Sequence, residues 1–217
     1  MDLFTQTWDD LRRAVAALPA DAFTQPSGCA GWLVRDLVCH LVIDAQDVLI
    51  TLATPTDEAP TRDAASYWAV SDTVDADDPL AALTVRLAAA YEDPSLLTFH
   101  LDDVGSAAGR AATLADPATR VRTQGFVLTT GDYLSAYVLE WTLHHLDLIA
   151  HLPGQAGPSD EGLAATRALL ERIVGEPFPA SLPDADVLLL GTGRRTPTAD
   201  EASTLGALTD RLPLVLG

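Results

Sequence analysis

The chain has no lysine and no asparagine, and all 13 of its basic residues are arginines. Without lysine there is no Schiff-base partner for pyridoxal phosphate, no phosphate-binding lysine of a P-loop and no lysine nucleophile. The only cysteines, Cys29 and Cys39, do not form the CxxC pair that a thiolate metal cage uses. These absences exclude lysine-based covalent chemistry and a cysteine-rich metal site.

Targeting and membrane-spanning signals are also missing. The first residues are amphipathic and lack the basic start and apolar core of a signal peptide, and no apolar run reaches about 18 residues. We therefore expect a cytoplasmic protein. Cys39 falls in an apolar helical run and is expected in the core, and a cytosolic setting argues against a disulfide between the two cysteines.

The composition bounds the size and the partners of the protein. With 217 residues, 48% of them hydrophobic, the chain is long enough for one domain or for a domain with an appended subdomain. The formal net charge of −18 would repel phosphate backbones and anionic lipid. We expect no nucleic-acid or membrane partner, and the sequence leaves monomer and homodimer open.

Helical periodicity runs through most of the chain. Patterns of apolar residues and end signals predict helices over 3–18, 33–54, 78–93, 130–152 and 160–174, the last capped by Ser159. The stretch 55–78 is expected to be mostly loop, and 97–124 gives only a weak indication of a short helix at 107–114. After Pro183, two short apolar runs, ADVLLLGTG and LPLVLG, predict two strands with a short helix between them.

Three residues on the long helices suggest a metal site. Glu140 and His144 are four residues apart in the 130–152 helix, so both side chains leave one face and reach one ion. His40 lies on the expected inward stripe of the 33–54 helix, and a third ligand from a facing helix would leave one coordination position open. Each part has an ordinary alternative, since Glu140 with His144 also fits a surface ion pair and His40 a core histidine.

Two segments carry a resemblance to a known family. GWLVRDLVCHLV at 31–42 and YVLEWTLHHLDLIAHL at 137–152 resemble the signature segments of the mycothiol-dependent maleylpyruvate isomerase family, a branch of the DinB/YfiT-like metal-binding bundles. VLLLGTGRR at 187–195 is similar to the strand and Gly-Arg turn of that family's small C-terminal subdomain. The resemblance implies a mainly α fold: a DinB-like four-helix bundle at 1–155, followed by a small α/β subdomain at 156–217.

The resemblance also implies a chemistry. It assigns His40, Glu140 and His144 as ligands of a divalent metal, zinc first, with nickel, iron or manganese as alternatives. It implies a mycothiol-like thiol as cosubstrate, whose sulfur the metal activates toward a small electrophile. Arg194 or Arg195 would bind a carboxylate of the substrate or thiol, or would be surface arginines. Asp44 and Asp147, one turn beyond a ligand histidine, are expected either to orient those histidines or to make helix-surface contacts.

Three functions remain in competition. The first is a metal-dependent isomerase or S-transferase that uses the thiol. The second is metal-assisted hydrolysis with Asp44 as a base, and dependence of the rate on added thiol would separate the two. The third is a non-catalytic metal-binding or regulatory protein, in which a structural metal would need a fourth protein ligand that the sequence does not reveal.

Overall fold

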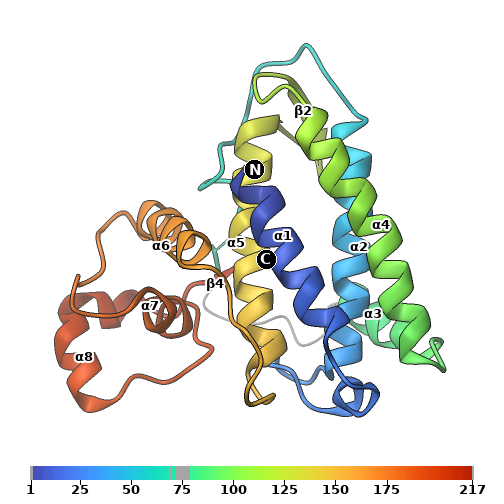
Figure 1. Ribbon diagram of the computed structural model, residues 1–217. Coiled ribbons are helices and arrows are strands. Elements are labelled where there is room, and N and C mark those ends of the chain that lie inside the picture. Colours follow the sequence, from blue (N-terminus) through green and yellow to red (C-terminus); the bar gives the residue numbers. More distant parts are fainter. Residues whose placement is uncertain (1, 69, 72–78, 217) are drawn as a thin grey trace.

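The computed structural model describes residues 2–68, 70–71 and 79–216, and within them the fold is mainly helical. Four helices stand side by side as a bundle, and the helices that follow residue 155 lie together on one side of it (Figure 1). The bundle helices are α1 Leu3–Ala16, α2 Val34–Leu52, α4 Pro94–Leu114 and α5 Thr130–Ile149. The predicted four-helix bundle is confirmed.

Local sequence signals explain where these helices begin. The side chain of Asp2 accepts a hydrogen bond from the backbone N–H of Thr5 at the start of α1, and Thr129 caps α5 through Asp132 in the same way. The same signal begins α6, Asp160–Val174, where Ser159 accepts from Gly162, and Gly175 ends it with φ +78°. The sixth helix thus has the bounds and the cap that the sequence predicts.

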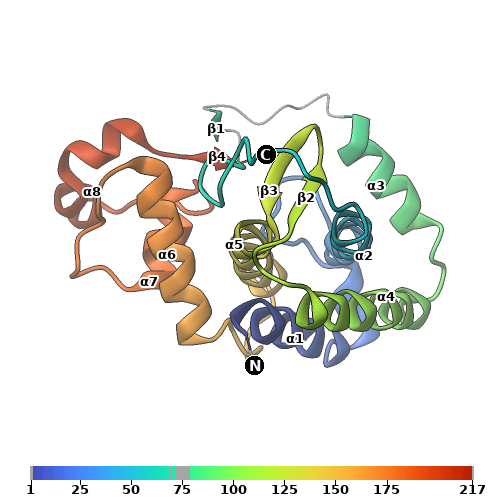
Figure 2. The same cartoon turned by 90° about the horizontal axis from the view of Figure 1, so that it is seen from above.

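Viewed along its axis, the bundle is a ring (Figure 2). α2 packs on α4, α4 on α1 and α1 on α5, whereas α2 and α5 are the neighbours in the ring that pack least extensively on each other. Trp8 of α1 stacks on Trp141 of α5 at 4.0 Å between ring centroids, and its indole N–H donates to the carbonyl of Gly105 on α4 at 2.8 Å. A Cβ at Gly105 would lie 2.7 Å from the Trp8 ring, so this crossing requires glycine.

Helix α4 is much longer than the sequence predicts. It covers 21 residues, whereas the weak pattern indicated only 107–114. The reason lies in its buried face, which after Leu97 and Leu101 is formed by small residues and therefore gives little hydrophobic periodicity. These small residues are Gly105, Ala108, Gly109 and Ala112.

A β-hairpin between α4 and α5 was also missed. β2 Arg120–Thr123 pairs antiparallel with β3 Phe126–Thr129, joined by Gln124 and Gly125 at φ 48° and 83°. Two left-handed residues in a two-residue loop are what a tight hairpin requires, and Gln at the first of them is an uncommon choice. Helix α3, Pro79–Ala89, ends earlier than predicted, and its expected start at Asp77 and Asp78 lies outside the described residues.

The chain after α6 differs in one element from the prediction. The predicted strand at ADVLLLG is wrong: these residues form α7, Asp184–Gly191. A short apolar run does not distinguish a buried strand from a buried helix by its period. The predicted short helix is present as α8, Ala199–Leu205, followed by the 3₁₀ turn η2, Gly206–Arg211.

The C-terminal run forms the expected strand, β4 Val215–Leu216, which pairs antiparallel with β1 Val70–Ser71 from the preceding half of the chain (Figure 2). A short 3₁₀ turn, η1 Ala20–Thr24, follows α1. Among the described residues, no helix is both long and apolar enough to cross a membrane.

Candidate metal centre

The seam between α2 and α5 is lined by polar side chains at one end of the bundle. His40 extends from α2, and Glu140 and His144 extend from α5. Nε2 of His40 lies 3.1 Å from Nε2 of His144 and 3.4 Å from Oε1 of Glu140, and Nε2 of His144 lies 2.9 Å from the same carboxylate oxygen. The three residues predicted as metal ligands are therefore brought together, each pointing its donor atom at the others.

Asp44 adds a fourth donor to this group. Its Oδ2 lies 3.1 Å from Nε2 of His40, and one donor atom from each of the four residues falls within 4.8 Å of the others. Asp44 is only 9% exposed, and Oδ2 is buried without a hydrogen-bond partner. A buried carboxylate oxygen without a hydrogen bond is costly unless something else satisfies it.

The outer side of the His144 ring is held by Asp147. Nδ1 of His144 lies 3.0 Å from Oδ2 of Asp147, which is 1% exposed. The guanidinium of Arg194 donates to both oxygens of that carboxylate, from Nε and Nη2, at 2.8 Å each. A carboxylate on Nδ1 fixes the ring orientation, so that Nε2 faces the centre and could bind a metal.

The loop before α2 closes over the same carboxylate. The backbone N–H of Gly28 donates to the Asp147 carbonyl at 2.8 Å, and a Cβ at Gly28 would lie 2.7 Å from Oδ1 of Asp147. Sγ of Cys29 lies 3.3 Å from Oδ2 of Asp147 and 3.7 Å from Nδ1 of His144. Cys29, His144 and Asp147 thus form a second group of possible ligands, but there the carboxylate is already paired with the cation of Arg194.

The electrostatics of the seam reflect its burial and crowding. Burial raises the pKa of Asp44 to about 6, opposed by the charge of His40 and assisted by the Glu140 carboxylate. Burial alone would raise the pKa of Glu140, but the charges and hydrogen bonds of His144 and His40 outweigh it and hold the pKa well below its usual range. Burial lowers the pKa of His144, yet the Glu140 charge, together with Cys29 and Asp147, raises it well above the ordinary value.

A divalent metal fits this donor set. Two imidazole nitrogens and two carboxylate oxygens are suitable ligands for zinc and for nickel, iron or manganese. The ion would satisfy the buried Oδ2 of Asp44 and separate two imidazole nitrogens that otherwise face each other. The side chains of His40 and Glu140 keep 24% and 18% of their exposure, so the centre is reachable from solvent.

The two arginines suggested for carboxylate binding lie in different places. Arg194 lies beside the centre, where two of its N–H groups donate hydrogen bonds to the carboxylate of Asp147. Arg195 pairs instead with Glu201 and Asp186, at 2.7 and 2.8 Å, within the C-terminal helices. Only Arg194 is therefore positioned near the predicted ligands.

The other half of the seam was not anticipated. Oδ2 of Asp47, one turn beyond Asp44, accepts hydrogen bonds from the hydroxyls of Tyr133 and Tyr137 at 3.0 and 2.8 Å. Burial, with the Asp47 charge as a further cause, raises the pKa of Tyr133 far above its ordinary value. A signal was available, because Tyr133, Tyr137, Glu140 and His144 repeat at steps of three and four on one face of α5.

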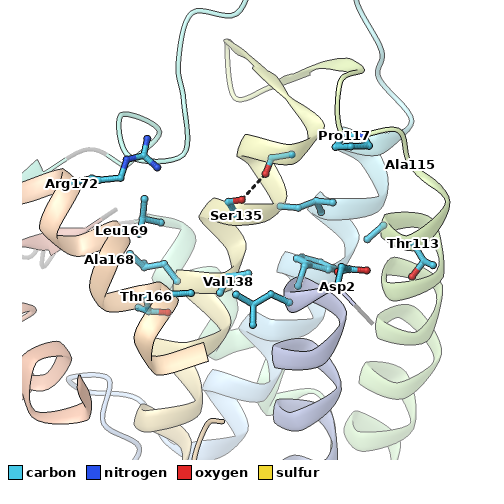
Figure 3. Close-up of a pocket in the computed structure, with 17 residues that line it drawn as sticks. Asp2, Thr113, Ala115, Pro117, Ser135, Val138, Thr166, Ala168, Leu169 and Arg172 are labelled. Carbon is cyan, nitrogen blue, oxygen red and sulfur yellow. Dashed lines mark hydrogen bonds between the residues drawn. The ribbon is translucent and has the colours of Figure 1, made fainter. Parts of the chain in front are cut away.

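A cavity of about 570 Å³ lies elsewhere, against α1, α4, α5 and α6. Figure 3 shows Val138 of α5, Leu169 of α6 and Asp2 before α1 around it. Its walls are mainly apolar and include none of the four clustered ligands, so size alone does not identify the chemical site here.

One of the comparisons with known proteins gives a match. The profile of the family described as mycothiol maleylpyruvate isomerase N-terminal domain matches residues 4–149, more than half of the chain. The chain belongs to this family. The matched region of the mycothiol maleylpyruvate isomerase family holds His40, Asp44, Glu140 and His144, whereas Arg194 lies beyond it. Neither a curated protein nor a solved structure matches the chain.

Proposed function

We propose that the protein is a metal-dependent enzyme that uses a low-molecular-weight thiol, mycothiol or a similar one, for S-transfer to or isomerisation of a small electrophile. The observation that carries this proposal is the convergence of His40 Nε2, Glu140 Oε1 and His144 Nε2 in a mostly buried seam that solvent still reaches. Membership of the mycothiol maleylpyruvate isomerase family supports the choice of thiol.

The three ligands and Asp147 each have a role in this proposal. His40, Glu140 and His144 hold the ion, and Asp147 keeps the His144 ring in the orientation that presents Nε2. A divalent ion, zinc first, would lower the pKa of a thiol and hold its sulfur toward the electrophile. The protein's own Cys39 is unsuited to that role, because burial and the Asp36 charge raise its pKa to about 11.

A second candidate function has one observation in its favour. A metal bound by four protein atoms has the closed coordination of a structural site, and Asp44 supplies the fourth donor that the sequence did not reveal. A non-catalytic metal-binding protein is therefore the alternative, and turnover must be tested separately from metal binding.

The first experiment is elemental analysis of the purified protein with variants of the ligands. We expect about one metal ion per chain in the wild type and almost none in His40→Ala and His144→Ala. His151→Ala is the matched control, because His151 is exposed and follows the same helix, and it should keep its metal. Absence of metal from the wild type, even after loading with zinc, would overturn the proposal.

The second experiment tests the thiol. Mycothiol or N-acetylcysteine is titrated into cobalt-substituted protein, and binding of sulfur to the ion should appear as a charge-transfer absorption band. A band together with thiol-dependent turnover of an electrophile supports the enzyme. Metal without a thiol band would favour the closed structural site, and thiol-independent ester or amide hydrolysis would favour metal-assisted hydrolysis instead.

A further inference from the structure

The two aspartates that follow the ligand histidines lie on opposite sides of their rings. Asp147 contacts Nδ1 of His144, the nitrogen turned away from the centre, at 3.0 Å. Asp44 contacts Nε2 of His40, the same nitrogen that faces His144 and Glu140. A carboxylate that only orients a metal-bound histidine takes the nitrogen that the metal does not use. Asp147 meets this condition and Asp44 does not.

The surroundings of Asp44 lead to the same result. Its Oδ2 is buried and unpartnered by any hydrogen bond, whereas both oxygens of Asp147 are paired with Arg194. The carboxylate one turn farther along α2, Asp47, is likewise satisfied, by two tyrosine hydroxyls. Of these three carboxylates, Asp44 is the one with a buried oxygen that receives no hydrogen bond, and that oxygen lies among the possible metal-ligand atoms, 3.1 Å from Nε2 of His40.

We propose that Asp44 is a fourth ligand of the metal and that it occupies the coordination position which the thiol must take. This inference rests on the proposed thiol function and deepens it. Four protein donors would complete the four-ligand set that zinc prefers, so Asp44 would compete with a thiol for the ion. Asp147 fixes the ring of His144 from behind, whereas no hydrogen bond holds the buried Oδ2 of Asp44, so Asp44 would be held less firmly than His144.

The ligand role is tested by metal affinity alone, without any reaction. Zinc dissociation constants of wild type, Asp44→Ala and Asp44→Asn are measured by competition with a chromophoric chelator. We expect Asp44→Ala to weaken zinc binding by about 100-fold or more, at or above the upper end for loss of an outer partner. Asp47→Asn, the same chemical change one turn away, should leave the affinity unchanged. Zinc affinity that is equal in wild type and both Asp44 variants would overturn the ligand role.

The displacement is tested with the cobalt-loaded proteins at saturating cobalt. Mycothiol or N-acetylcysteine should bind Asp44→Ala more tightly than wild type, by about tenfold for a competitor worth ~1.4 kcal/mol. The spectrum of the thiol-free wild type should also show the strong absorption of four-coordinate cobalt, which weakens in Asp44→Ala as water completes a larger shell. Weaker or equal thiol binding by Asp44→Ala would overturn the displacement.

The failure of this inference is distinguishable from failure of the proposed function. If no thiol band develops in wild type or in Asp44→Ala, both the thiol function and the displacement are overturned, yet the zinc affinities still decide whether Asp44 is a ligand. If the thiol binds both proteins equally while zinc binding depends on Asp44, the proposed function stands and only the displacement fails.

Discussion

Each half of the seam between α2 and α5 places an aspartate of α2 opposite polar side chains of α5. The two halves differ in whether that aspartate receives hydrogen bonds. In one half, Asp47 accepts hydrogen bonds from Tyr133 and Tyr137, so this half-buried carboxylate is paired by the protein itself. In the other half, Oδ2 of Asp44 has no hydrogen-bond partner and two histidine nitrogens face each other at 3.1 Å. The same two antiparallel helices therefore contain one complete polar contact and one in which carboxylates and imidazoles crowd together.

The difference shows which side chains make one part of a helical bundle suitable for binding an ion. A carboxylate opposite two hydroxyls is a stable pair with little need of any ligand. Where a carboxylate faces another carboxylate and two imidazoles, several hydrogen-bond acceptors repel one another. Only a proton or a metal ion between them removes this repulsion. Substitutions in the half that contains Asp44 should therefore change metal affinity. Substitutions in the half that contains Asp47 and the tyrosines should change only the stability of the fold.

The largest effect is expected from Glu140. Replacing Glu140 with Gln keeps the shape of the side chain but removes the anionic donor that lies within 3.4 Å of both histidines. We expect zinc affinity to fall by more than about 100-fold, beyond the range for an outer partner. Chelator competition measures it, and retention of near wild-type affinity would show that the ion is not bound in this half of the seam.

A smaller effect on metal is expected from Asp147→Asn. Loss of the carboxylate on Nδ1 should weaken zinc binding by about 10- to 100-fold, as loss of an outer partner does. Isothermal titration with zinc measures it. An effect as large as that of Glu140→Gln would mean that Asp147 itself binds the ion, within the group that includes Cys29.

The same substitution should also make stability depend differently on pH. Burial would raise the pKa of Asp147, but His144 and Arg194 outweigh it and lower the pKa below the ordinary 3.8. A lowered carboxyl pKa contributes stability above the unfolded value and loses it as the pH falls through the folded value. In metal-free protein, Asp147→Asn should cost about 3 kcal/mol near pH 7, as for a broken buried pair. Urea unfolding should show that cost shrinking below pH 3.8, and a cost that grows there would contradict the account.

The tyrosine half should behave as structure alone. Tyr133→Phe and Tyr137→Phe each remove one hydrogen bond to Asp47 and should lower the free energy of unfolding by about 1–2 kcal/mol, with zinc affinity unchanged. Denaturant unfolding and chelator competition on the same samples test both parts. A loss of zinc binding at constant stability would remove the distinction between the two halves.

The smallest effect is expected at Arg195. Its partners Glu201 and Asp186 are partly exposed and do not belong to the clustered ligands, so Arg195→Gln should cost less than about 1 kcal/mol and leave zinc binding intact. Arg194→Gln is the matched comparison, since it exposes Asp147 to solvent and should weaken zinc binding. Equal zinc affinities in the two variants would show that Arg194 has no effect on metal binding.

Much of this seam was predictable from the sequence. The four-residue step from Glu140 to His144 fixes both on one face of a helix, and His40 stands out as a polar residue on an apolar stripe. The side of the ring that each aspartate takes was not predictable, because His–Asp pairs three or four residues apart reach either nitrogen, depending on rotamers that tertiary packing selects. For this reason Asp44 and Asp147 looked equivalent in the sequence and differ in the structure.

The elements that were missed share a physical cause. Helix α4 was shortened in the prediction because its close packing on Trp8 uses small residues such as Gly105, which leave no hydrophobic signal. Helix α7 was mistaken for a strand because eight residues with a short apolar run fit either period. The predicted boundary at residue 155 between bundle and C-terminal subdomain stays a prediction.

The most direct test of the central claim is a crystal structure of the zinc-loaded protein with anomalous diffraction recorded on both sides of the zinc absorption edge. We predict one anomalous peak in the seam, about 2.0–2.2 Å from Nε2 of His40, Nε2 of His144 and a carboxylate oxygen of Glu140, with Asp44 as the fourth ligand. No peak between α2 and α5, or a peak at Cys29 and Asp147 instead, would contradict it.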